Sequence, residues 1–184
     1  MKAVKLIVLD VDGTLTDGVI HYETNNSSVG DGIEHKHFHV ADGLGIVMAQ
    51  SVGLRVAVVS GRQNLTVAWR MAELNVSDVL QGIEDKAAAL RGLMAIYGLN
   101  SDEIAYVGDD INDLPAFDVA GVRIAVADAN WIVRDRADFI TPRAGGRGAV
   151  RDAIEEILRS QGKLQEAVDA YLNLKSQPES KATQ

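Results

Sequence analysis

The sequence predicts an α/β protein built on a parallel β-sheet with helices on both faces. Short apolar runs alternate with longer amphipathic segments along the 184 residues, and this pattern is typical of strands buried on both sides and connected by crossover helices. Polar residues or glycine follow the earlier apolar runs. Because the carboxyl ends of parallel strands meet at one edge of such a sheet, we expect a ligand site there.

The expected elements follow from this alternation. The predicted strands are Lys5–Leu9, Arg55–Val59, Ile104–Val107, Arg123–Val126 and a weaker Phe139–Ile140. The helical period and nearby glycines predict helices at about 43–51, 64–74, 84–97, 113–119 and 149–160. The length fits one domain over residues 1–160. Residues 161–184 are expected to be helical as far as Leu172, followed by a mobile polar tail at Asn173–Ser180.

Residues 17–41 differ from the rest of the chain. They are rich in Gly, Asn, Ser and β-branched or aromatic residues, which predicts a β-hairpin inserted after the first strand. The segment is too short for a separate cap domain. Its extra length is expected around Asn25–Gly30.

Composition narrows the possible functions. The chain carries 26 acidic and 18 basic side chains, a formal charge of −8, which argues against a nucleic-acid-binding protein. It has no cysteine, so disulfides and thiolate chemistry are excluded. No apolar run reaches the roughly 18 residues of a membrane span, and Asp10 interrupts the first run too early for a secretory signal. We therefore expect a soluble cytoplasmic protein with a small-molecule partner and no membrane contact.

The first polar cluster contains Asp10 and Asp12, which follow the first strand directly. One carboxylate can attack an electrophile and hold a metal, while the other handles a proton. Gly13 allows a sharp turn, and its amide can approach an anion. Taken alone, the same residues also fit a calcium loop or a plain polar turn.

The second and third strands add further candidates. Ser60 offers a hydroxyl at the same sheet edge, although it also fits a helix N-cap. Lys86 is a point charge suited to a phosphoryl oxygen, although a lone lysine is usually only solvated. Asp109, Asp110 and Asp113 crowd three carboxylates together, which favours Mg²⁺ over a solvated acidic turn.

The combination of these clusters is more specific than any one of them and predicts metal-assisted phosphoryl transfer. Asp10 would attack phosphorus to give an aspartyl phosphate, and Asp12 would protonate the leaving alcohol and then activate water. Mg²⁺, Ser60 and Lys86 would stabilise the charge of the transition state.

In this order the motifs resemble the haloacid dehalogenase (HAD) superfamily of phosphohydrolases, which implies a Rossmann-like sheet. The shorter signals resemble its branch of 3-deoxy-D-manno-octulosonate 8-phosphate (KDO-8-phosphate) phosphatases, which lack a large cap. These signals are Asp10–Gly18, Phe38–Ile46, Ser60–Arg62, Gln81–Gly82 before Lys86, Gly108–Asp110, Val126–Ala129 and Gly145–Arg151.

The resemblance implies a role for each matching residue. Asp10 is the nucleophile and a Mg²⁺ ligand, Asp12 is the acid/base and binds the metal through its carbonyl, and Asp109 completes the ligands. Asp110 and Asp113 support these ligands from behind. Ser60 and Lys86 match the phosphate-binding positions. The residues expected to bind the sugar acid are His39, Asp42, Gly43, Gly61, Arg62 and Arg70.

The resemblance also implies a homotetramer in lipopolysaccharide precursor synthesis, in which the hairpins form a small barrel and neighbouring subunits close each site. Ala41 and Val47 stand where family members often carry a basic residue, which leaves the sugar acid open. The alternative substrate is a nonulosonate 9-phosphate. By the same resemblance, related nonulosonate phosphatases carry Glu at the position of Arg62, so Arg62 favours the octulosonate.

Two alternatives outside hydrolysis are a phospho-accepting receiver domain and an idle assembly module. Three further signals have two interpretations each. His35, His37 and His39 alternate and would share one face of a strand, where they could bind a transition metal or line the hairpin. The stretch Gly145–Gly148 is either an anion-binding loop or a simple turn. Trp69 and Trp131 are expected to be packing residues.

Overall fold

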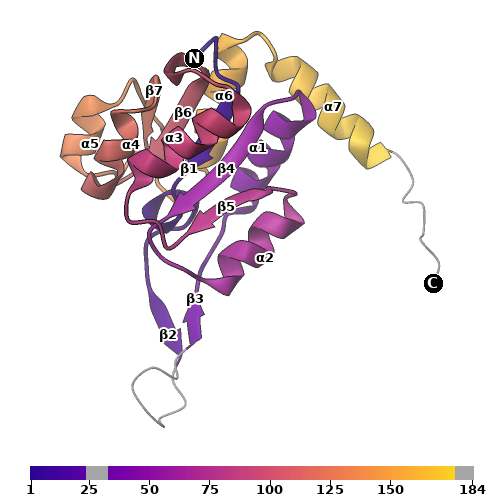
Figure 1. Ribbon diagram of the computed structural model, residues 1–184. Helices are drawn as coiled ribbons and strands as arrows, with labels where there is room; N and C mark the ends of the chain where they lie inside the picture. Colours follow the sequence, from indigo (N-terminus) through magenta and orange to yellow (C-terminus); the bar gives the residue numbers. More distant parts are fainter. Residues whose placement is uncertain (24–32, 177–184) are drawn as a thin grey trace.

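The computed structural model describes residues 1–23 and 33–176. A parallel sheet forms its centre, as the sequence predicted, and it has six strands where five were expected. In spatial order the strands are β5 (Asp78–Gln81), β4 (Arg55–Ser60), β1 (Leu6–Leu9), β6 (Ile104–Gly108), β7 (Val122–Ala125) and β8 (Phe139–Ile140). Figure 1 shows this sheet with helices around it and a thin hairpin projecting from one end.

Strand β1 lies in the middle of the sheet. Its residues Leu6–Leu9 are fully buried, and it pairs with β4 on one side and β6 on the other, with Leu9 opposite Val58 and Val107. A strand covered on both faces needs apolar residues at every position. Because of the register with β4 and β6, the three strands end at nearly the same level, and the residues that follow them lie close together.

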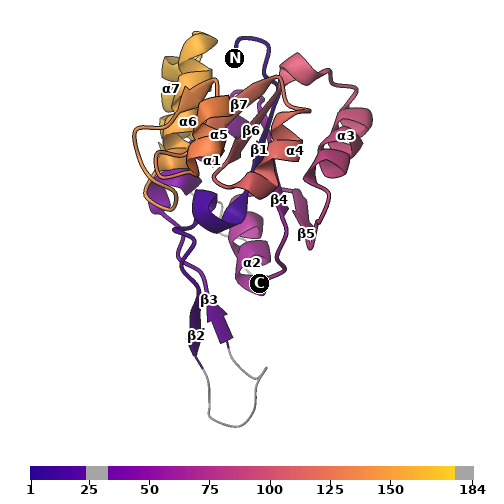
Figure 2. The same ribbon diagram turned by 90° about the vertical axis from the view of Figure 1, so that its left-hand side faces the viewer.

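The described chain forms seven α-helices around the sheet. They are α1 (Val40–Ser51), α2 (Leu65–Glu73), α3 (Lys86–Tyr97), α4 (Leu114–Phe117), α5 (Trp131–Arg136), α6 (Ala149–Ser160) and α7 (Leu164–Ser176). Helices α1, α6 and α7 pack together on one face of the sheet, and α3 packs with α4 on the other. Figure 2 shows the two groups on opposite sides of the strands.

Two elements were missed by the sequence analysis. The strand β5 is an edge strand whose residues are all half-buried, so its pattern lacks the apolar run of the inner strands. Helix α5 is less than two turns long and buries only Val133, which is too little for a helical period to be seen. Helix α1 also begins earlier than expected, at Val40.

The predicted hairpin is present between β1 and α1. Strand β2 (His21–Glu23) pairs antiparallel with β3 (Ile33–His35), and Thr16 bridges to Phe38. It projects beyond the ends to which the β4 and β5 arrows point (Figure 1). The expected insertion around Asn25–Gly30 lies outside the described residues.

The chain after α6 differs in part from expectation. Helix α7 runs as far as Ser176 and packs on α1 and α6, so the first four residues of the expected polar tail, 173–176, are helical. The rest of that tail lies outside the described residues. Among the helices described, none is long and apolar enough to cross a membrane.

The packing role expected for both tryptophans is wrong. Trp69 and Trp131 are each 69% exposed. Helix α2 buries Val67 and Met71 instead, and residue 69 lies on the other face at the helical spacing. In α5 the buried position is Val133, two residues beyond the tryptophan.

Candidate active site

The site begins at the turn after β1. Asp10 leaves the strand with its backbone N–H donating to Val107 O at 3.0 Å, and residues Val11–Leu15 form one wide helical turn closed by Thr16 N to Val11 O at 2.9 Å. Gly13 has a φ of +86°, and a Cβ there would lie 2.1 Å from a carboxylate oxygen of Asp109. The glycine therefore lets this turn approach the acidic loop after β6.

Asp10 is buried beside a buried cation. Its Oδ1 lies 2.9 Å from Nζ of Lys86, the first residue of α3. Burial raises the pKa of Asp10 to about 7, and the negative charge of Asp113 acts in the same direction. Burial lowers the pKa of Lys86, but the charges of Asp10 and Asp113 outweigh it and leave that pKa above its ordinary value. Lys86 therefore stays protonated near neutral pH.

Three carboxylates meet at this point. Asp10, Asp109 and Asp113 each offer an oxygen, and these oxygens lie within 4.8 Å of one another. Burial, reinforced by the charges of Asp10 and Asp113, raises the pKa of Asp109 to about 8. The raised pKa values show that ionising all of these buried carboxyls is unfavourable in the metal-free protein. A divalent cation would neutralise their negative charges. Oxygen-only donors suit a hard ion such as Mg²⁺, so the residues fit the expected metal.

Asp113 braces the cluster from behind. Its Oδ1 accepts hydrogen bonds from Lys86 Nζ and Tyr106 Oη, both at 2.6 Å, and its Oδ2 accepts the backbone N–H groups of Asp109 at 2.8 Å and Asp110 at 3.2 Å. Both oxygens are thus used within the protein. Asp113 therefore contacts Lys86 and the Asp109 loop, and its expected role behind the metal ligands stays a prediction.

A small cavity of about 200 Å³ opens at the carboxyl ends of the strands. Its lining brings together sequence-predicted residues from three separate loops: Asp10, Asp12, Gly61, Arg62, Asp109 and Asp110, together with Asn112. Sequence reasoning missed Asn112, although it stands between Asp110 and Asp113 in the acidic cluster. The side chain of Thr14, also missed, donates to Asp109 Oδ1 at 3.1 Å and orients that carboxylate.

Ser60 is the last residue of β4 and is buried behind the rim of this cavity. Its hydroxyl oxygen accepts the backbone N–H of Arg62 at 3.2 Å, which shapes the turn that carries Gly61 and Arg62. The helix-cap alternative does not apply to it, because Asn64 caps α2 through the N–H of Thr66.

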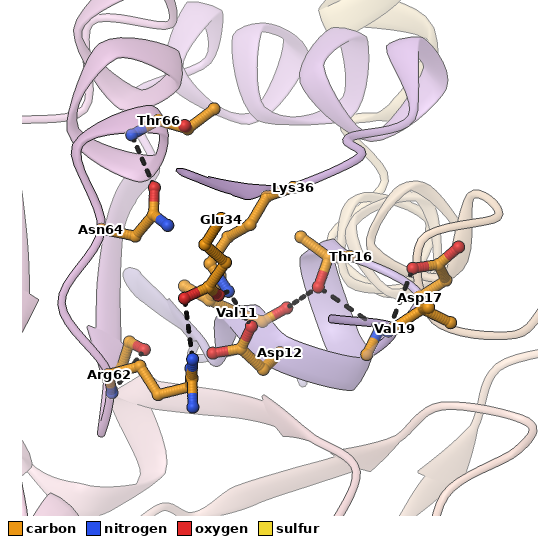
Figure 3. Close-up of polar contacts among 12 residues, drawn as sticks. Val11, Asp12, Thr16, Asp17, Val19, Glu34, Lys36, Arg62, Asn64 and Thr66 are labelled. Carbon is orange, nitrogen blue, oxygen red and sulfur yellow. Dashed lines mark hydrogen bonds and ion pairs between the residues drawn. The ribbon is translucent and has the colours of Figure 1, made fainter. Parts of the chain in front are cut away.

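The hairpin supplies two site residues that the sequence analysis missed. Lys36 contacts Oδ1 of Asp12, and its Nζ also lies 2.9 Å from Oε1 of Glu34. The other oxygen of Glu34 accepts a hydrogen bond from Arg62 at 2.7 Å. Figure 3 shows the four side chains in an alternating chain of charge that crosses from the β1 turn through β3 to the loop after β4. Only tertiary structure brings them together, so no local motif could indicate them.

Four of the expected substrate residues lie elsewhere in the single chain. Nδ1 of His39 accepts the N–H of Ala41 and caps α1. Asp42 is buried and accepts backbone N–H groups from the α6 region. Gly43 and Arg70 line a separate groove of about 240 Å³ between α1 and α2, which also contains Val47.

The contacts of the alternating histidines decide between their two interpretations. His35 pairs with Glu23 at 3.1 Å, whereas the His37 ring lies 5.0 Å from that of His21. Since His39 is a helix cap, the three alternating histidines do not converge, and the acidic trio forms the only metal-type cluster found among the described residues.

The glycine stretch before α6 is a turn. The N–H groups of Gly145, Gly146 and Gly148 donate to Asp128 Oδ1, Thr14 O and Asp42 Oδ2. Since these donors are already used within the protein, the anion-binding interpretation is not supported.

Comparisons with known proteins agree with this site. A family model described as haloacid dehalogenase-like hydrolase matches residues 64–154. The 3-deoxy-D-manno-octulosonate 8-phosphate phosphatase KdsC of Haemophilus influenzae is 40% identical over 163 residues, which covers 89% of this chain and 87% of that protein. Its counterpart in Escherichia coli K12 is 41% identical over 164 residues, covering 89% and 84%.

Solved structures lead to the same family. The 3-deoxy-D-manno-octulosonate 8-phosphate phosphatase of Moraxella catarrhalis, in complex with magnesium ion, phosphate ion and KDO, matches with a TM-score of 0.85 at 38% identity, over 92% of this chain and 94% of that one. The cobalt-bound form of the Haemophilus influenzae phosphatase gives a TM-score of 0.83 at 38% identity, over 93% and 98%. The chain therefore belongs to the 3-deoxy-D-manno-octulosonate 8-phosphate phosphatase (KdsC) family of haloacid dehalogenase-like hydrolases.

Proposed function

We propose that the chain hydrolyses KDO-8-phosphate to KDO and inorganic phosphate, with Mg²⁺, through an aspartyl phosphate on Asp10. The observation that carries this proposal is the buried carboxylate of Asp10, 2.9 Å from the Lys86 ammonium, at the base of an acid-lined cavity. These groups are the ones that a phosphoryl-transfer site needs: a nucleophile, a fixed cation and oxygen ligands for a metal.

The proposed metal ligands are the carboxylates of Asp10 and Asp109 and the backbone carbonyl of Asp12. When bound, Mg²⁺ would screen the negative charges of the carboxylate and the phosphate as they approach. The clustering of Asp10, Asp109 and Asp113 oxygens within 4.8 Å supports this assignment. Asp113 keeps the Asp109 loop in place through its backbone N–H bonds.

Each step uses a residue of this chain. An oxygen of Asp10 attacks phosphorus while the bond from phosphorus to the sugar oxygen breaks, and Asp12 gives its proton to that leaving oxygen. Asp12, now a carboxylate, takes a proton from water as the water attacks the aspartyl phosphate. Phosphate leaves and Asp10 is regenerated. Lys86 and Ser60 are proposed to stabilise the transferring group.

The sugar acid is proposed to bind at the rim, where Gly61 and Arg62 line the cavity. A guanidinium is well suited to a carboxylate. His39, Asp42, Gly43 and Arg70 are proposed to act from the α1 side, and the groove that contains Gly43 and Arg70 supports this for those two residues. The alternative substrate remains a nonulosonate 9-phosphate, because Ala41 and Val47 replace the usual basic residues.

A homotetramer is proposed to complete the site, in a cytoplasmic role that supplies KDO for lipopolysaccharide. Val19, Ile20 and Tyr22 support the assembly, because these apolar side chains are exposed on the hairpin. Light scattering on the purified protein gives the subunit number. Ile20→Asp should shift it toward smaller species, and a wild-type monomer would contradict the assembly.

The activity is tested by phosphate release from KDO-8-phosphate and from a nonulosonate 9-phosphate, with Mg²⁺ and after complete chelation. We expect faster turnover of the octulosonate, and we expect that turnover to depend on Mg²⁺. Asp10→Asn should release no phosphate. Faster turnover of the nine-carbon substrate would favour the alternative. A stable phospho-Asp10 without turnover would favour a receiver domain, and unchanged release by Asp10→Asn would contradict the mechanism.

A further inference from the structure

Lys36 is a cation of the hairpin whose side chain is buried. Its side chain is 4% exposed, whereas the neighbouring His35 and His37 are exposed. Removing an ammonium from water is unfavourable unless carboxylates compensate it. Two do so here: Asp12, which it contacts directly, and Glu34, at 2.9 Å.

We propose that Lys36 is a positioning residue that holds the carboxyl group of Asp12 through its Oδ1, in the orientation that lets the other oxygen give and then take the proton. The inference rests on the proposed function, because it needs Asp12 to serve the leaving oxygen and then water. It makes the hairpin part of the catalytic apparatus of its own chain. The contacts of Glu34 and Lys36 bring this part of the hairpin into the site, although the sequence analysis considered only its histidines as possible ligands.

The local backbone explains why Asp12 needs a partner. Asp12 interrupts the helical turn, with φ −78° and ψ 116°, and its side chain remains 27% exposed. Such a side chain can rotate among staggered conformers. An ion pair to a buried ammonium favours one of them, whereas Lys86 is already engaged with Asp10 and Asp113.

Glu34 fixes Lys36 in turn. One of its oxygens pairs with Lys36, and the other accepts a hydrogen bond from Arg62 at the cavity rim. The positive charges of Lys36 and Arg62 lower the pKa of Glu34, although its burial acts the other way. The ammonium is therefore held between two carboxylates from different segments, the turn after β1 and the strand β3 (Figure 3).

The chemistry separates positioning of Asp12 from general support of the fold. An alkyl phosphate, such as a sugar phosphate, needs a proton on its leaving oxygen, whereas p-nitrophenyl phosphate expels a stable phenolate without one. If Asp12 is misoriented, Asp10 still attacks the aryl phosphate and releases nitrophenolate. Hydrolysis of the aspartyl phosphate then remains slow, because water activation also uses Asp12.

The variants are Lys36→Met, Lys36→Arg and Glu34→Gln, with Lys2→Met as a charge-matched control. Lys2 is exposed at the N-terminus, which lies far from the hairpin (Figure 1). Each is assayed with saturating Mg²⁺ on KDO-8-phosphate, and by rapid mixing with p-nitrophenyl phosphate. Circular dichroism and light scattering check that the fold and assembly match the wild type. Where Lys36→Met does not fold, Lys36→Arg and Glu34→Gln carry the same comparison.

We expect Lys36→Met to lower kcat on KDO-8-phosphate by about 100-fold, in the range of acid–base catalysis, with KM nearly unchanged. On p-nitrophenyl phosphate it should give a nitrophenolate burst approaching one per site, followed by slow turnover. Lys36→Arg should recover part of kcat. Glu34→Gln should lose less than Lys36→Met, because Lys36 can still contact Asp12, and Lys2→Met should behave as wild type.

Several results would overturn the inference. One is a wild-type kcat in Lys36→Met, and others are a loss of its nitrophenolate burst together with kcat or a rise in KM alone. Equal losses of kcat in Glu34→Gln and Lys36→Met would also overturn it, because Lys36 would then only hold the hairpin in place. Failure of the proposed function looks different: the wild-type protein itself would release no phosphate from KDO-8-phosphate.

Discussion

Nζ of Lys86 lies 2.9 Å from Oδ1 of Asp10, at the carboxyl edge of the sheet. The same ammonium donates to Asp113 at 2.6 Å, so one buried cation serves two buried carboxylates. With Asp109 ionised as well, the cluster would carry more negative than positive charge. Burial, reinforced by this repulsion, raises the pKa values of Asp10 and Asp109 and makes the site suitable for a divalent cation.

Replacing Lys86 with Met should abolish most activity and destabilise the fold. The variant loses a charge that stabilises the transferring phosphoryl group, worth about 10²–10³ in kcat for one donor. It also leaves Asp10 and Asp113 without their cation, and breaking a buried pair in this way costs about 3–5 kcal/mol. Phosphate release and urea denaturation measure the two effects.

The double variant Lys86→Met/Asp113→Asn separates these contributions. Since Asp113→Asn removes one of the stranded charges, the double variant should regain part of the lost stability without regaining activity. Lys2→Met is the control for removal of an exposed lysine. Unchanged urea stability in Lys86→Met would contradict the structural role of the pair.

The metal-free protein should become less stable as pH rises from about 4 to 8. Burial raises the pKa of Asp10 to about 7 and that of Asp109 to about 8, from an ordinary 3.8. The folded state therefore binds more protons than the unfolded state in this window, and the associated stability is present at low pH and lost as pH passes through the raised values.

Thermal melting at pH 5.5 and pH 8, with chelator or Mg²⁺, measures this dependence. We expect a lower Tm at pH 8 without metal, and a larger gain from Mg²⁺ there because the ligands are then ionised. Asp109→Asn should flatten the dependence. If the Tm of the metal-free protein is not lower at pH 8 than at pH 5.5, the predicted pH dependence is contradicted.

The sequence was sufficient to predict the inner strands of the sheet and several residues at its carboxyl edge. An inner strand needs a continuous apolar run, and the polar residue that ends the run marks the position of the site. Asp10, Ser60 and Asp109 were found in this way, and each stands at or directly after the end of β1, β4 or β6. The edge strand β5, half-buried along its length, gave no comparable signal.

Contacts between distant segments could not be predicted from the sequence. Lys36 meets Asp12 across 24 positions of sequence, and Asp42 meets Arg151 across 109. Nothing in the pattern near Lys36 or Asp42 distinguishes a structural partner from a ligand-binding residue. For the same reason, the alternating histidines suggested a shared metal site, although Nδ1 of His39 caps a helix.

Gly145→Ala should impair both folding and catalysis, whereas Gly92→Ala should not. A Cβ at Gly145 would lie 1.7 Å from Gly13 O, in the turn that follows Asp10, whereas a Cβ at Gly92 in α3 meets nothing within 4 Å. The first substitution must displace the catalytic turn. The second removes a helix glycine and should stabilise by about 0.5–1 kcal/mol.

Urea denaturation and phosphate release on the two glycine variants test this contrast. We expect Gly145→Ala to lose stability and kcat together, because the turn it displaces carries Gly13, which packs against Asp109. Wild-type kcat in Gly145→Ala would show that the close approach of the two backbones is not needed for the site.

Asp42→Ala should destabilise the fold with little change in kcat. Oδ1 of Asp42 accepts Arg151 N at 2.8 Å and Oδ2 accepts Gly148 N at 3.2 Å, at the start of α6. Burial raises the pKa of Asp42, which is consistent with its enclosed position. Leaving buried donors unpaired costs about 1–3 kcal/mol, so the variant should melt at a lower temperature.

Asp42→Asn should lie between wild type and Asp42→Ala, because its single amide oxygen replaces only one of the two acceptors. Asp135→Ala, at an exposed position on α5, is the matched control and should melt as wild type. The kinetic result decides between two roles for Asp42. An unchanged KM for KDO-8-phosphate, with a lower Tm, means that Asp42 serves α6; a wild-type Tm with a raised KM means that it binds the sugar acid.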